Sequence, residues 1–63
     1  MSIKNEIIKE INGVENSIEN LSRKLENIIN ENNFDENNIY TKLYRALGAV
    51  SCIIENNEEF IED

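Results

Sequence analysis

The segment from Ile7 to Ile28 reads IIKEINGVENSIENLSRKLENI and indicates the fold of the chain. Apolar residues recur in it at alternating intervals of four and three residues, which is the a/d pattern of a coiled-coil helix and not the alternation of a strand. The members of this pattern are Ile7, Ile11, Val14, Ile18, Leu21, Leu25 and Ile28. The pattern predicts a first helix over about residues 3–30, with Ser2 as its N-cap.

The segment after this pattern is rich in asparagine and predicts a turn at residues 31–35. Asparagine is a weak helix former that tolerates the left-handed conformation, so it favours a helix C-cap here. Asp35 is expected to cap the next helix. Phe34 and Ile39 should then pack against each other across that cap as a hydrophobic staple.

A second heptad pattern predicts a second helix over about residues 36–61. Because the connecting turn is short, the two helices should be antiparallel neighbours in an all-α hairpin that forms one domain over residues 1–63. The main apolar seam of the second helix is predicted to contain Ile39, Leu43, Ala46, Val50, Ile53, Asn57 and Phe60. A second apolar row beside it contains Tyr40, Tyr44, Leu47, Ile54 and Ile61.

One hairpin cannot cover all of these apolar rows. The second row of the second helix, together with Ile8 and Ile29 beside the first seam, should stay exposed, and exposed stripes of this length mark an interface. Isoleucine at both a and d favours bundles of more than two helices. We therefore expect a homodimer that forms a four-helix bundle, or a higher oligomer. Its interface should contain Ile7, Ile8, Ile11, Val14, Ile18, Leu21, Leu25, Ile28, Leu43, Leu47, Val50 and Ile54.

Thirteen acidic side chains against six basic ones give the chain a formal net charge of -7. Nucleic-acid binding depends on Lys and Arg at the phosphates, so nucleic acid is not the expected partner. The acidic balance favours a protein with a basic surface instead. Nucleic-acid binding by a hairpin dimer remains the alternative, and it would use Lys9, Arg23, Lys24, Lys42 and Arg45.

The residues that usually carry enzyme and metal chemistry are scarce. With no histidine and one cysteine, a structural zinc site and an intrachain disulfide are excluded, and no cofactor is expected. Cys52 should be a packed thiol, with a disulfide between subunits as the alternative. A two-helix hairpin offers no deep pocket for acid–base catalysis, so the chain is expected not to be an enzyme. No apolar run reaches membrane-spanning length and no signal peptide is recognisable, so a cytoplasmic location is expected.

The best functional hint lies in the second helix. Acidic residues crowd its C-terminal end, where the helix dipole disfavours them, so the helix should fray there unless a basic partner docks. The residues expected to bind a partner are Tyr40, Tyr44, Glu55, Glu58, Glu59 and Glu62. These features predict a small acidic binding protein that inhibits or regulates another protein by steric, charge-complementary contact. Its size and composition suit a phage or mobile element acting on a host defence protein. A structural oligomerisation module completed by a partner helix is a further alternative.

Overall fold

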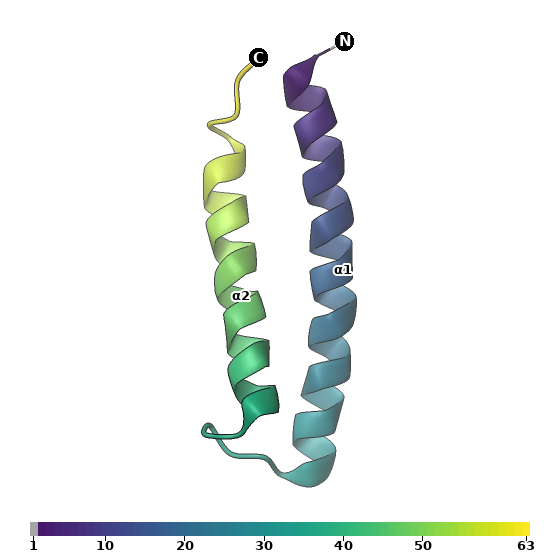
Figure 1. Cartoon of the computed structure of the whole chain (residues 1–63), viewed down its shortest axis with the longest axis vertical. Helices are drawn as coiled ribbons and strands as arrows, with labels where there is room; N and C mark the ends of the chain where they lie inside the picture. The colour runs from purple at the N-terminus through teal and green to yellow at the C-terminus, as the bar shows by residue number, and fades with distance from the viewer. Residues whose placement is uncertain (1) are drawn as a thin grey trace.

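The computed structural model describes residues 2–63 and shows two long helices in an antiparallel hairpin (Figure 1). Helix α1 spans Ile3–Asn32 and helix α2 spans Ile39–Glu58, with no strand between residues 2 and 63. The hairpin is a rod of 47 × 16 × 12 Å, and both chain ends lie at the end opposite the loop (Figure 1). The predicted all-α hairpin is therefore confirmed.

Both ends of α1 follow from local sequence. Ser2 is the N-cap, and its hydroxyl oxygen accepts a hydrogen bond from the backbone N–H of Asn5 at 3.2 Å. At the other end, Asn33 adopts the left-handed conformation, with φ 54° and ψ 41°, and its N–H donates to the carbonyl of Ile29. Asparagine adopts this conformation at lower cost than most residues. The first helix thus ends two residues beyond its predicted limit.

The second helix begins later than predicted, because Asn38 and not Asp35 is its N-cap. The side chain of Asn38 accepts from the N–H of Tyr40 at 2.9 Å. The Asp35 carboxylate instead accepts from the N–H of Asn37 at 3.0 Å, which closes a turn inside the loop. Asp35 and Asn38 lie three residues apart and both can cap a helix, but the Asp35 side chain is already bonded within the loop.

The predicted hydrophobic staple is also wrong, and an aromatic pair takes its place. The ring of Phe34 stacks on the ring of Tyr40, with centroids 5.7 Å apart and planes 13° from parallel. Ile39 stays exposed. Since the helix starts at Ile39, the next residue and not Ile39 is turned toward Phe34.

The C-terminal end of α2 falls at Glu58, three residues before the predicted limit. A turn follows, in which the N–H of Ile61 donates to the carbonyl of Glu58 at 3.2 Å. The tail then reaches α1, where the Asp63 carboxylate accepts from the Ser2 hydroxyl and, at 2.8 Å, from the N–H of Lys4. An acidic side chain is favourable at this helix N-terminus and unfavourable at the C-terminal end of α2.

The interior of the hairpin is one narrow strip where the two helices meet. Leu25, with 5% of its surface exposed, is the one buried side chain within residues 2–63. Half-buried side chains continue the strip along both helices at heptad spacing. On α1 these are Ile8, Ile11, Glu15, Ile18, Ser22, Ile28 and Ile29, and on α2 and its C-terminal extension they are Thr41, Tyr44, Leu47, Ser51, Ile54, Glu58 and Ile61.

The rotation of each helix about its own axis differs from the prediction. Ile8, Ile29 and most of the second row of α2 were expected to stay exposed, and they are half-buried against the other helix. The predicted main seam of α2 is exposed instead, as Leu43 and Val50 show. The apolar arc of each helix is wider than the strip that one neighbouring helix can cover, so one apolar row of each helix stays exposed to solvent.

Candidate functional site

An exposed apolar surface runs along both helices. We call it the apolar face and define it by large side chains that are each 43 to 63% exposed. Its members are Ile3, Ile7, Val14 and Leu21 on α1 and Ile39, Leu43, Val50 and Ile53 on α2. A shallow groove beside Val14 and Leu21 continues it on α1.

The two halves of the apolar face lie on the same side of the hairpin. Val14 precedes the inward-facing Ile18 by four residues, and Val50 precedes the inward-facing Ile54 by four residues. The same offset on two antiparallel right-handed helices turns side chains to the same side of the pair. The exposed rows therefore form one surface two helices wide.

A cluster of carboxylates lies where the helices meet near the chain ends. Glu15 of α1 is half-buried between the helices. Partial burial raises the pKa of Glu15 above its ordinary value, and repulsion from Glu58 and then from Glu55 raises the pKa further. We call Glu15, Glu55 and Glu58 the acidic cluster. Within residues 2–63 none of the three forms an ion pair.

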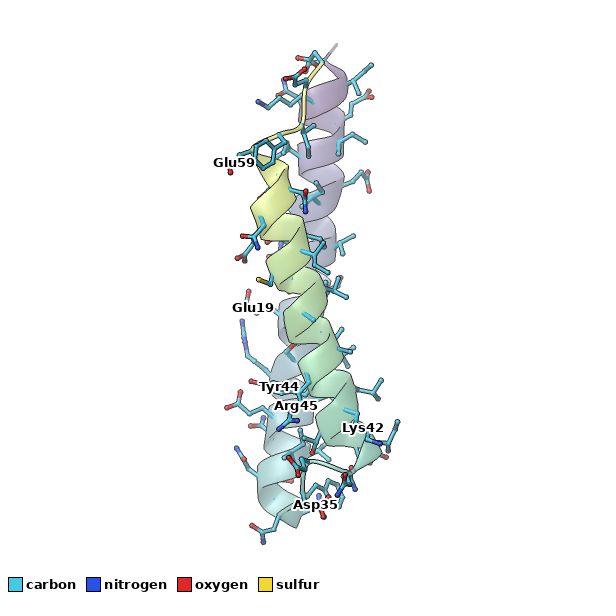
Figure 2. The ribbon with its side chains drawn as sticks, turned by 90° about the vertical axis from the view of Figure 1, so that its left-hand side faces the viewer. Glu19, Asp35, Lys42, Tyr44, Arg45 and Glu59 are labelled. Carbon is cyan, nitrogen blue, oxygen red and sulfur yellow. The ribbon has the colours of Figure 1, made fainter. Side chains whose placement is uncertain are left out.

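The acidic cluster lies on the side of the hairpin opposite the apolar face, because Glu15 precedes Ile18 by three residues where Val14 precedes it by four. On α2, Glu58 follows Ile54 by four residues, where Val50 precedes it by four. Figure 2 shows Glu19 of α1 and Glu59 beyond α2 projecting along the same edge. In the described part of the chain, one ion pair is formed, between Arg23 and Glu19. Arg23 follows Glu15 by eight residues, which is more than two helical turns, so its guanidinium lies away from the acidic cluster.

The residues predicted at an oligomer interface divide into two groups. Ile8, Ile11, Ile18, Leu25, Ile28, Leu47 and Ile54 line or border the strip between the two helices of one chain. The others, Ile7, Val14, Leu21, Leu43 and Val50, lie on the apolar face. Only the second group is free to meet another molecule, and whether it does so stays a prediction.

The residues predicted to bind a partner are also spread over different surroundings. Tyr40 is 41% exposed and stacks on Phe34, whereas Tyr44 is half-buried against α1. Among the acids, Glu58 is half-buried in the acidic cluster. Glu55, Glu59 and Glu62 are exposed. Sequence reasoning missed Glu15, although its place beside the predicted seam at heptad spacing was a usable signal.

Other candidate features carry less chemistry. Cys52 was expected to be packed and is exposed, with the amide of Asn56 at 3.5 Å from its sulfur. Across residues 2–63 no three His, Cys, Asp or Glu side chains are grouped to hold a metal ion. The described helices include none that is both long and apolar enough to cross a membrane.

The raised pKa of Glu15 makes the stability of the hairpin pH-dependent. As pH rises from the ordinary value of 4.5 through the raised pKa, Glu15 becomes charged in the folded state at a cost. We therefore expect Tm to fall over this range, and Glu15→Gln to raise Tm at pH 7 and flatten the fall. Thermal unfolding followed by circular dichroism at pH 4.5 to 7.5 measures both effects.

The matched control is Glu26→Gln, which removes an exposed carboxylate from the same helix. An equal rise in Tm for both variants would mean that net charge, and not the position of Glu15, sets the effect.

At a pH below 3.8, the ordinary pKa of an aspartate, the stability of the hairpin should fall again. There the lowered pKa of Asp63, due first to its bond from Ser2, is reached and that bond is lost.

No family model matches the chain, and neither the curated proteins nor the solved structures include a significantly similar one.

Proposed function

We propose that the chain is a non-enzymatic binding protein whose polar side docks on a basic surface of another protein and regulates it by covering that surface. The observation that carries this proposal is the acidic cluster, in which partial burial and then the charges of Glu58 and Glu55 raise the pKa of Glu15, and no ion pair neutralises the three carboxylates. A basic partner would relieve this repulsion, so the acidic cluster should bind positively charged side chains.

The surroundings of the cluster support the same proposal. Glu59 and Glu62 are exposed just beyond the end of α2, so they extend the negative surface toward the chain ends. Negative potential over a patch of this kind steers a basic partner to it and raises the association rate. The mechanism is steric: the hairpin occupies the partner's basic surface and keeps other ligands away.

The proposed setting is the cytoplasm. A single exposed thiol, Cys52, suits a reducing compartment, where it stays unpaired. The chain would act there without a cofactor and without chemistry of its own. Its helices supply a rigid frame, and its charges supply the selectivity.

Charge reversal tests whether position or total charge matters. The triple variant Glu55→Lys, Glu59→Lys and Glu62→Lys should lose most of its retention on a poly-L-lysine column. The measurement is the salt concentration at elution, because the retention of a charged surface depends steeply on salt. We expect the triple variant to elute well before its control.

The control reverses three exposed acids at the loop end: Glu26→Lys, Glu31→Lys and Glu36→Lys. Both triple variants have the same net charge, so equal elution would contradict a localised binding surface. A heparin column run in parallel tests the nucleic-acid alternative. Retention of the natural chain on heparin at low salt, with steep salt dependence, would favour that alternative over a basic protein partner.

A further inference from the structure

We propose that the apolar face binds a second copy of this chain, so that two hairpins meet face to face in a four-helix homodimer. This inference goes beyond the proposed function, which uses the opposite, polar side. The exposed row on α1 keeps the seven-residue spacing of coiled-coil packing, as Ile7, Val14 and Leu21 show. That spacing fits a partner that is itself helical.

The choice of rows inside the hairpin is the first argument. The strip between the helices contains the polar residues Glu15, Ser22 and Ser51, while the exposed row of α1 is entirely apolar. A small turn of each helix about its axis would exchange these rows and bury more apolar surface. A hairpin that stayed monomeric would gain stability from that exchange. The observed rotation reserves the more apolar rows for contact with another molecule.

The exposed area is the second argument. The accessible surface of the chain is 5047 Å² at a mass of 7.3 kDa. Compact monomers of this mass expose about 4,200 Å² by the usual scaling of area with mass. The excess of about 800 Å² equals the area that each partner contributes to a standard stable interface. Burying an area of this size on the apolar face would bring the chain to an ordinary surface-to-mass ratio.

Charge is the third argument, and it indicates which kind of molecule binds the apolar face. On α1 the heptad row that begins at Ile3 also carries Glu10, Lys24 and Glu31. On α2, Lys42 projects from the edge opposite Glu19 and Glu59 (Figure 2), so the charges beside the apolar face are few and of both signs. Nearly all of the net charge of -7 therefore lies elsewhere. A strongly basic partner would find little to pair with here. A second acidic copy can approach this face without pressing its acids against those of the first.

Sedimentation equilibrium in reducing buffer, with circular dichroism at the same concentrations, tests the proposal. The natural chain should be helical with twice its 7.3 kDa mass. Leu21→Glu places a charge in the apolar face and should raise the dimer dissociation constant at least about 100-fold. Asn12→Glu adds the same charge to an exposed position of α1 on the polar side and should leave the dimer intact.

Three results would overturn the proposal. A helical natural chain of single mass would show that the hairpin needs no second copy. An unfolded chain of single mass would show that the face belongs to a different protein. Equal dissociation constants for Leu21→Glu and Asn12→Glu would show that a dimer forms through another surface. None of these results depends on retention by poly-L-lysine, so the proposed function can fail or stand independently.

Discussion

Replacing Leu25 with alanine should remove a large part of the stability of the hairpin and lower Tm by roughly 10 to 40 °C. Leu25 is the one buried side chain within residues 2–63, at 5% exposure. Truncating a buried leucine costs about 2–5 kcal/mol, through lost transfer free energy and the cavity left behind. A chain of 63 residues has a total stability of about 3–9 kcal/mol. One truncation is therefore comparable with the whole.

Thermal and urea unfolding by circular dichroism measure this loss. The control is Leu25→Met, which keeps the side-chain volume and should cost less than about 1.5 kcal/mol. If Leu25→Ala unfolded at the same temperature as the natural chain, the strip between the helices would not be the source of stability. The stability of the hairpin would then have to come from contacts other than those of Leu25.

The parts of the fold that depend on neighbours in sequence could be predicted. The limits of α1 follow from Ser2, whose hydroxyl caps the first turn, and from Asn33, which takes the left-handed conformation after the last turn. The antiparallel arrangement follows from the short loop. The start of α2 could not be decided in this way, because Asp35 and Asn38 are equally good caps. Only the loop geometry shows that Asp35 is already engaged with Asn37.

The rotation of the helices could not be predicted from periodicity. The inward row of α1 contains Ile11, Ile18 and Leu25, and apolar residues lie on both sides of it. Two seams with the same spacing are therefore possible, one through Val14 and one through Glu15. The more apolar seam is the natural first choice for a single hairpin. The structure uses the seam with the carboxylate, a choice that the proposed dimer would explain, because its second layer of helices would cover the other seam.

The same ambiguity explains what was missed at the candidate site. Acidic residues near the chain end were predicted to bind a partner from their crowding on α2 alone. The third member of the acidic cluster, Glu15, belongs to α1. The rotation of both helices decides whether its charge interacts with those of Glu58 and Glu55. A charge cluster built from two elements depends on tertiary packing, which the spacing within one helix does not contain.

Replacing Glu58 with leucine should stabilise the hairpin by about 1–2 kcal/mol, since a half-buried position gains part of the full burial of a leucine. Three costs disappear with the carboxylate. It is partly desolvated between the helices, it repels Glu15, and it stands at the last turn of α2, where the dipole disfavours a negative charge. The pKa of Glu15 should also move back toward its ordinary value, which an NMR titration of that carboxyl group would detect.

Glu59→Leu is the matched control, because it removes the same charge one residue later from an exposed position. It should leave Tm and the titration of Glu15 almost unchanged. If Glu58→Leu and Glu59→Leu gave the same Tm, the helices would not be closed against each other at this end. The decisive comparison combines stability with binding. A Glu58→Leu variant that is more stable yet elutes earlier from poly-L-lysine would show that the chain retains an unfavourable carboxylate because binding requires it. A more stable variant with unchanged retention would remove Glu58 from the binding surface and leave Glu55, Glu59 and Glu62 to carry it.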